Sequence, residues 1–339
     1  MKQWIKYVIS AAIAVLLLYY SFKGVKWDSF IDGIRSCRWE WVIVSMIAGV
    51  FVFWLRAVRW RLLLLPVDKT VSCKTTFNAI NIGYLTNLAL PRIGEFVRCG
   101  FITRHSTDGA ASYDKVLGTV IIERSWDVIT MFLLVILLSI CMWSRFGSFF
   151  MDKIFRPMSG SVDISLFWIL LTTAVLLAAA ILLIFKFRDS NKILRSVYRF
   201  IAGIWQGAIS CFKMKDTWKF LATTAAIWGT YWIMSCCILW AVQGIDTASA
   251  DSGLATAIGQ LPSLGILDAL FLMLAGSLSS LVPVPGGFGA FHYVVASALA
   301  AVYGIPWEAG IIFATLSHES QTVTMLICGG CSYAAEVTK

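Results

Sequence analysis

The sequence has few charged residues and no polar stretch long enough to fold as a separate soluble domain. Of its 339 residues only 14% are charged and 59% are hydrophobic, and the mean hydropathy is +0.78. These values are typical of integral membrane proteins rather than soluble globular ones. The sequence therefore predicts one membrane domain over residues 1–339, with no attached catalytic module and no cofactor.

The sequence also contains no nucleotide-binding motif, so any energy that the protein needs would come from an ion gradient, a lipid gradient or a partner. Cys328 and Cys331 have the spacing of a redox or metal pair. They lie within a predicted membrane helix with no second pair or His nearby, which argues against that interpretation. We interpret the nine cysteines as small hydrophobic residues, and we predict no metal site.

Basic residues are in excess, with a net charge of +9, and the chain contains 15 Trp. Trp residues beside charged ones are the expected anchors at membrane–water interfaces. The chain offers no soluble basic face for a nucleic acid, so the charge predicts contact with anionic lipid headgroups. The expected partner is an anionic phospholipid or a lipid-linked molecule, and the oligomeric state stays open.

Long apolar runs predict about six transmembrane helices, because a crossing needs roughly 20 apolar residues. The first run could instead be a signal peptide, but no small-x-small cleavage site follows it, so we interpret it as a retained helix. The segment 23–39 is expected to connect the first two spans. The predicted spans are 4–22, 40–60, 115–143, 164–187, 217–243 and 308–333.

Two further apolar regions, 76–104 and 264–303, contain a short repeated motif. Residues 90–96 and 282–288 both read apolar, Pro, two variable residues, Gly, one variable residue, Phe. A Pro removes a backbone donor and ends a membrane helix, so we expect re-entrant helical hairpins at both places. Interrupted segments at corresponding places in two halves of a membrane protein indicate a binding site between the halves.

Basic loops indicate the orientation of the chain. Loops 56–75 and 186–219 are rich in Lys and Arg, whereas loop 244–266 has neither. Because cytoplasmic loops carry the excess of Lys and Arg, we expect both termini on the cytoplasmic side of a bacterial inner membrane. Three arginines that end the second span would share one helix face and reach lipid headgroups. They are Arg56, Arg59 and Arg61.

This orientation gives the chain an internal symmetry. Its halves, about 1–145 and 160–335, cross the membrane in opposite directions, so their hairpins enter from opposite sides. That is an inverted-topology repeat, which many transporters have. Residues 191–212 carry apolar side chains at helical spacing and basic ones on other faces, a pattern that predicts an interfacial helix.

The first motif carries a charged cluster. Arg92, Glu95 and Arg98 lie three residues apart, so they would share one face of a helix that begins at Arg92. Pro91 suits a helix N-terminus, which favours anions, and Arg binds phosphate in a bidentate manner. The cluster therefore predicts a headgroup-phosphate site. The alternative is that Glu95 pairs with one arginine and the cluster only holds the hairpin to its neighbours.

The third span carries three charges within an apolar helix. Glu123 and Asp127 lie four residues apart with Arg124 between them. Ionisable groups inside a membrane are functional candidates, and these could reach the arginines of the first motif. The alternative is a topological role near the interface.

The second motif carries no charge. Pro285, Gly286 and Gly287 allow close backbone approach and expose N–H groups, which could bind phosphate. The alternative is tight packing at the tip of the hairpin.

Two histidines and a glutamate follow the second motif. His292 comes soon after it, and His318 and Glu319 lie on the last span. A histidine in a membrane core could relay protons or act as a polar gate. The spacing of these residues matches no local metal motif, so a metal site is not predicted.

Three segments, in this order, carry a resemblance to a known family. They are Asn87-x-x-x-Pro91-Arg92-Ile93-Gly94-Glu95-x-x-Arg98, Glu123-Arg124-x-x-Asp127 and Pro283-x-Pro285-Gly286-Gly287-x-Gly289. The sequence resembles the transmembrane region of lysylphosphatidylglycerol synthases and the wider family of flippase-like membrane proteins, over nearly the whole chain. The resemblance implies a polytopic protein with two re-entrant regions that moves or handles lipids. Aminoacyl transfer belongs to a separate soluble domain of the synthases and is not implied.

The family often has an acid shortly after the Pro-Gly-Gly turn, where this chain has His292. It also often has an Arg in the last span, where this chain has His318 and Glu319. If those family positions bind the headgroup or couple transport, the substrate or the coupling would differ here.

The sequence therefore predicts a lipid flippase or transporter whose polar pocket lies between the hairpins. Phosphate would be held by Arg92, Arg98 and Arg124. The acids Glu95, Glu123 and Asp127 would position these arginines. The group of two histidines and Glu319 would serve the opposite half. The alternatives are a membrane-embedded transferase or hydrolase acting on a lipid-linked substrate, and a non-catalytic partner of a lipid-modifying enzyme. No catalytic residue is predicted. The predicted substrate-binding residues are Asn87, Arg92, Glu95, Arg98, Glu123, Arg124, Asp127, Pro285, Gly286, Gly287, His292, His318 and Glu319.

Overall fold

The computed structural model describes residues 3–106, 110–143, 195, 214–245 and 264–338. By their contacts the residues fall into two units, one made of residues 1–120 and 218–339 and the other of residues 121–217. All secondary structure in the described ranges is helical, and no β-strand occurs in them. The prediction of an all-α membrane protein is confirmed, whereas the division into inverted halves stays a prediction.

Four of the described segments are long and apolar enough to cross a membrane, or five if the bent pair α1 (Gln3–Phe22) and α2 (Trp27–Ser36) is one span. The predicted span 164–187 and, apart from residue 195, the predicted interfacial helix 191–212 lie outside the described residues. The count of six spans therefore stays a prediction. The four segments are α3 (Trp39–Leu64), α6 (Tyr113–Cys141), α11 (Thr217–Gln243) and Pro285–Tyr303.

Helix α2 lies in the segment that was expected only to connect two spans. It turns by 88° from α1, and the ring of Phe22 at the end of α1 stacks on Trp27 at a centroid distance of 5.6 Å. Asp28 in its first turn and Arg35 in its last turn both complement the helix dipole. The corner is held to the last helix, because Lys26 donates its backbone N–H to Glu308 Oε1 at 2.9 Å.

The first hairpin consists of α4 (Cys73–Ala89) and α5 (Gly94–His105), which pack against each other. The expectation that a helix begins at Arg92 is wrong. Arg92 has a φ of 63° and precedes the helix, because the chain reverses direction within four residues and a left-handed residue allows this. A Cβ on Gly94 would overlap the carbonyl oxygen of Gly83, so only glycine lets the two helices approach this closely.

The second hairpin consists of α13 (Ile266–Ser279), a turn that contains the short helix η3 (Pro285–Gly287), and α14 (Ala290–Tyr303). Three glycines of the turn have positive φ. Helix α1 packs along this turn, where Ser10 donates its hydroxyl to Pro283 O and Ala14 packs against Val284. The three glycines are Gly286, Gly287 and Gly289.

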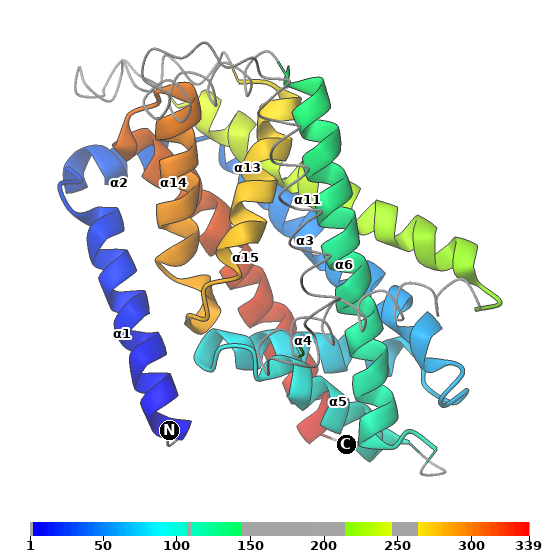
Figure 1. Cartoon of the computed structure of the whole chain (residues 1–339). Helices are drawn as coiled ribbons and strands as arrows, with labels where there is room; N and C mark the ends of the chain where they lie inside the picture. The colour runs from blue at the N-terminus through cyan, green and yellow to red at the C-terminus, as the bar shows by residue number, and fades with distance from the viewer. Residues whose placement is uncertain (1–2, 107–109, 144–194, 196–213, 246–263, 339) are drawn as a thin grey trace. The chain divides into compact units, whose positions relative to one another are not determined.

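The tips of the two hairpins meet. Arg92 Nη2 donates to Leu281 O at 2.9 Å and to Ser280 O at 3.3 Å, just past the end of α13. These are carbonyls at a helix C-terminus, where a cation is favourable. In Figure 1, α13 and α14 run side by side, and α4 and α5 lie below them. Entry from opposite sides of the membrane stays a prediction.

The last helix, α15 (Trp307–Val337), has the length of a span but a polar middle over residues 317–324. Thr322 and Thr324 donate their hydroxyls to the carbonyls four residues earlier, at 3.0 and 2.8 Å. Because these side chains bond within the helix, apolar surroundings tolerate them. Both hairpins pack on α15, through α4 and through α14.

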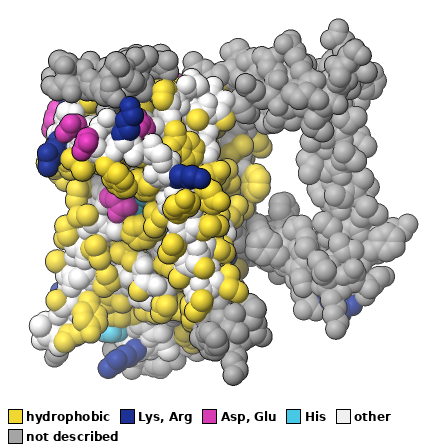
Figure 2. All heavy atoms as spheres, turned by 90° about the vertical axis from the view of Figure 1, so that its left-hand side faces the viewer, with side chains coloured by type: hydrophobic (Ala, Val, Ile, Leu, Met, Phe, Trp, Pro, Cys, Tyr) yellow, Lys and Arg dark blue, Asp and Glu magenta, His cyan; other side chains and the backbone are white. Residues whose placement is uncertain are grey.

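A hydrophobic core of the first unit lies mainly among α11, α13, α14 and α15. It includes Leu239, Leu272, Val295 and Phe313, all nearly inaccessible to solvent. The outer surface is hydrophobic as well. Figure 2 shows hydrophobic side chains across the middle of one face, with charged side chains gathered toward its ends and one acidic side chain near its middle. This distribution is typical of a protein whose middle faces lipid chains.

Candidate functional site

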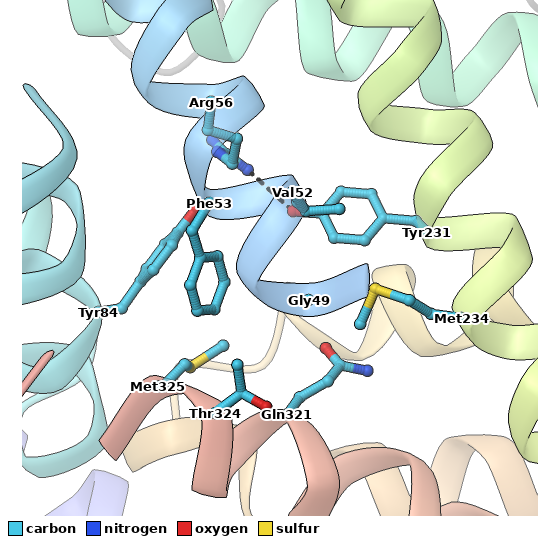
Figure 3. Close-up of a pocket in the computed structure, with 10 residues that line it drawn as sticks. All are labelled: Gly49, Val52, Phe53, Arg56, Tyr84, Tyr231, Met234, Gln321, Thr324 and Met325. Carbon is cyan, nitrogen blue, oxygen red and sulfur yellow. Dashed lines mark hydrogen bonds between the residues drawn. The ribbon is translucent and has the colours of Figure 1, made fainter. Parts of the chain in front are cut away.

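A cavity of about 110 Å³ lies among α3, α4, α11 and α15 in the first unit. Figure 3 shows its lining, with Arg56 on one side and the polar residues of α15 on the other. None of the residues predicted from the sequence as substrate-binding lines it. The lining residues are Gly49, Val52, Phe53, Arg56, Tyr84, Tyr231, Met234, Gln321, Thr324 and Met325.

Arg56 supplies the cation of this cavity. The residue is only 6% exposed, although α3 is one of the apolar candidate spans. Its Nη1 donates to the hydroxyl of Tyr231 at 3.3 Å, and its guanidinium lies 5.8 Å from the centre of the Tyr84 ring. Two phenol groups from different helices thus orient the guanidinium beside the cavity.

The expectation that Arg56, Arg59 and Arg61 share a lipid-facing side is wrong. Arg59 is fully buried, 5.7 Å from the centre of the Phe220 ring, and its Nη1 donates to Thr224 Oγ1 at 3.4 Å. Arg61 points elsewhere and donates to Val71 O at 2.8 Å. Aromatic rings of α4 and α11 provide faces for the buried guanidinium groups, so these side chains turn inward.

The charged residues of the first hairpin contact one another and the hairpin itself. Glu95 and Arg98 form an ion pair one turn apart, and the buried guanidinium of Arg98 lies 4.5 Å from the centre of the Trp60 ring. Asn87 Oδ1 accepts the backbone N–H of Gly94 at 2.7 Å. These contacts are those expected of a cluster that holds the hairpin together, and phosphate binding by Arg98 stays a prediction.

The acids of the third predicted span lie on α6, in the second unit. Arg124 Nη1 lies 3.3 Å from Asp127 Oδ2, one turn away, and Glu123 is buried. Their approach to the first motif stays a prediction.

The second hairpin and α15 bring the predicted His/Glu group together. His318 Nε2 lies 2.9 Å from Gly286 O, and its Nδ1 lies 2.9 Å from Glu319 Oε1. His292 Nε2 lies 3.8 Å from the same carboxylate oxygen. The sequence did not predict this convergence, because positions 292 and 318 lie on different helices.

The glycine turn itself is closely packed. A Cβ on Gly287 would lie 3.3 Å from His318 Nε2, and one on Gly286 would lie 2.7 Å from the Phe288 ring. Pro285 begins η3, as its fixed φ allows. The packing interpretation of the turn is thus supported, and phosphate binding there stays a prediction.

Comparison with known families agrees with these features. The family model described as the lysylphosphatidylglycerol synthase TM region matches residues 4–329. The chain belongs to this family. It is therefore a multi-pass membrane protein of the lysylphosphatidylglycerol synthase TM type.

A curated relative is the UPF0104 membrane protein PH1989 of Pyrococcus horikoshii. It is 29% identical over 132 residues, which are 38% of this chain and 38% of the relative. The matched part thus spans little more than a third of that relative. No solved structure matches the chain.

The sequence alone did not predict the residues that line the cavity of the present chain. The most important of them are Arg56, Tyr84, Tyr231 and Gln321. The available signal was the presence of Arg56 and Arg59 near the end of an apolar span, since a cation inside a membrane marks a functional candidate. Helical spacing alone does not show which neighbours surround a side chain, so it predicts these arginines at the lipid interface.

Proposed function

We propose that the protein moves an anionic lipid headgroup between the leaflets of the bacterial cytoplasmic membrane, with both termini in the cytoplasm. The observation that carries this proposal is a buried Arg56 at the wall of a cavity inside apolar helices. A cation in such a place favours an anionic ligand, because low dielectric strengthens their attraction.

The rest of the lining suits a phospholipid headgroup. Tyr84, Tyr231 and Gln321 offer neutral hydrogen-bond donors for the remaining phosphate oxygens. Met234 and Met325 add adaptable apolar contacts at the edge of the cavity. A cavity of about 110 Å³ is smaller than the 300–1,000 Å³ of typical ligand sites, so it accommodates a phosphate-sized group. A larger headgroup would require the helices around it to separate.

In this proposal the tip of the first hairpin receives the headgroup before the cavity does. Arg92 is exposed and stands at the junction of the two hairpins, where it contacts carbonyls of the second. Arg98 would contribute positive charge there, with Glu95 positioning it.

The test is leaflet exchange by the purified full chain in liposomes that contain fluorescent phosphatidylglycerol, read out with a membrane-impermeant quencher. Wild-type protein should accelerate exchange. Arg56→Gln should lower the affinity for the headgroup, and with it the rate of exchange, about ten- to a hundredfold. The reason is that a hydrogen bond to a charged group is worth about 1.5–3 kcal/mol. Arg35→Gln, on the exposed side of α2, should leave the rate unchanged.

A further variant, Arg92→Ala, separates the two proposed positions of the headgroup. If it abolishes exchange while Arg56→Gln has no effect, phosphate binds at the hairpin tip and not in the cavity. Failure of wild-type protein to accelerate exchange of any anionic lipid, with turnover of a lipid-linked substrate instead, would replace the transporter by a transferase or hydrolase.

A further inference from the structure

Three ligand-type side chains converge at the tip of the second hairpin. His292, His318 and Glu319 each offer a nitrogen or oxygen atom, and these atoms lie within 4.8 Å of one another. His292 and His318 are both buried, and the side chain of Glu319 is 39% exposed. A buried pair of imidazoles beside a carboxylate is the donor set of a transition-metal site.

The contacts of the His318 ring indicate which of its two nitrogens carries the proton. The other nitrogen faces Glu319. A carbonyl oxygen only accepts, so the 2.9 Å contact with Gly286 O places the ring proton on Nε2. In the neutral ring, Nδ1 then presents a lone pair to Glu319 Oε1, 2.9 Å away. Two lone pairs at this distance repel unless a positive species lies between them. The species is a metal ion or a proton.

The surroundings favour a metal ion. A ring N–H donated to a backbone carbonyl is the usual support of a metal-binding histidine, because it fixes the tautomer. His292 Nε2 lies 3.8 Å from the same carboxylate oxygen, which offers a third ligand atom that a shared proton would not need. In a tetrahedral zinc site, N and O ligands are about 3.3 Å apart. The ligand atoms lie within 4.8 Å of one another, so the observed spacings require changes of about 1.5 Å or less.

Aromatic rings limit the number of ligands. Phe22 lies 5.7 Å from the His292 ring, and Phe288 and Phe291 lie 5.0 and 5.3 Å from the His318 ring. This crowding suits four-coordinate zinc better than six-coordinate metals, which need more open positions. We propose that His292, His318 and Glu319 bind one zinc ion, with a fourth position open to water or an anionic oxygen. The ion would tie α14 to α15, next to the glycine turn whose Gly286 O contacts His318.

The site stands independently of the transport proposal, so its test uses metal binding alone. The full chain, purified without a polyhistidine tag and treated with a chelator, is titrated with Co²⁺, whose visible spectrum reports coordination, and then with competing Zn²⁺. Wild-type protein should bind one equivalent with the strong visible bands of tetrahedral N/O coordination. His318→Gln and His292→Gln should each weaken binding about a hundredfold or more, since each removes a direct ligand, which matters more than the 10–100-fold effect of outer-shell partners.

His105 provides the matched control. Its ring also lies between a carbonyl, Phe101 O at 2.9 Å, and a carboxylate, Glu336 Oε2 at 3.0 Å, but it has no third ligand nearby in the described residues. His105→Gln should therefore leave Co²⁺ binding unchanged. A single elution peak and an unchanged unfolding temperature would show that each variant folds.

Three results would overturn the proposal. One is the absence of stoichiometric Co²⁺ binding to wild-type protein. That result would mean that a proton, and not a metal ion, lies between His318 and Glu319, and it requires no variant. Another is equal affinity in folded His318→Gln and wild-type protein. The third is a spectrum with thiolate charge-transfer bands that Cys331→Ser removes, which would move the ion to the cysteines of α15.

Discussion

The two hairpins share a sequence motif but are held in different ways. The first uses side chains: Asn87 accepts a backbone N–H across the turn, and Glu95 pairs with Arg98. The second uses its backbone, because three glycines of its turn adopt positive φ and a carbonyl, Gly286 O, lies 2.9 Å from His318 on a neighbouring helix.

The motif glycine shows the difference at a single position. In the first copy it is Gly94, which begins α5 and lies against the backbone of Gly83. In the second copy it is Gly286, which has a φ of 58° inside the turn. A shared pattern therefore predicts where a membrane helix breaks, but the surrounding residues decide what the glycine does there.

Gly94→Ala should have the largest effect on stability. The added Cβ would overlap the carbonyl oxygen of Gly83, and rigid backbone on both sides leaves no easy relief. Overpacking of this kind costs about 3 kcal/mol or more. Thermal unfolding in detergent measures it, and Gly100→Ala on the same helix is the control, because a Cβ there meets nothing within 4 Å. Equal unfolding temperatures for the two variants would contradict the close packing of α4 and α5.

Gly289→Ala tests the second hairpin in the same assay. Its φ of 78° is unfavourable for alanine, and the Cβ would lie 2.7 Å from the backbone nitrogen of Leu18 on α1. We expect a loss of about 2–3 kcal/mol. Gly304→Ala shares the positive φ, 67°, but meets no neighbour, so it should lose only about 1 kcal/mol of stability, the cost of a Cβ in the left-handed region. If Gly289→Ala and Gly304→Ala lose the same stability, the contact with α1 contributes nothing to the stability of the turn.

Asn87→Ala removes the acceptor that closes the first hairpin. The backbone N–H of Gly94 then lacks its 2.7 Å partner, which should lower stability by about 1–2 kcal/mol. Asn87→Asp keeps an acceptor oxygen and should retain most of that stability. A similar loss in both variants would show that Asn87 acts through packing and not through this hydrogen bond.

Arg92 tests the junction between the tips. Arg92→Ala removes the bonds to Ser280 O and Leu281 O and leaves a non-glycine residue at a φ of 63°, so we expect a loss of about 1 kcal/mol. Arg92→Gly loses the same bonds but relieves the backbone, and it should be about 1 kcal/mol more stable than the alanine variant. The reverse order would place the backbone of residue 92 outside the left-handed region.

The smallest expected effect concerns the far end of the first hairpin and depends on pH. Hydrogen bonds from Thr70 and then Ser106 lower the pKa of the Asp68 carboxyl below its usual 3.8. Because the folded pKa is the lower one, the stabilisation is complete above the unfolded pKa and is lost as pH falls through the folded pKa. Asp68→Asn should thus be less stable than wild type at pH 7, and the difference should shrink below about pH 4. A difference that does not change with pH would contradict the charge-dependent bonds.

The sequence was sufficient to predict the helical class, the breaks at Pro91 and Pro283 and the family, because these depend on local composition. It did not predict that Arg92 precedes the helix, since the conformation of a turn depends on how its two helices pack. It also missed α2, although Trp27 and Phe30 lie at helical spacing in that segment.

The cavity and the His/Glu cluster were beyond sequence reasoning for a different reason. Arg56 and Gln321 line one cavity although 265 positions separate them, and only tertiary packing brings α3 beside α15. Burial of a cation depends on which aromatic rings cover it, here those of Tyr84 and Phe220 for Arg56 and Arg59. Arginines inside an apolar span mark a candidate site, but residue spacing along the chain shows neither relation.

The most direct test of the central claim is a structure of the full chain in lipid nanodiscs rich in an anionic phospholipid. The account predicts phosphate density in the cavity, within hydrogen-bond distance of the Arg56 guanidinium and close to Tyr231 and Gln321. A lipid whose phosphate lies elsewhere, with only water beside Arg56, would contradict it.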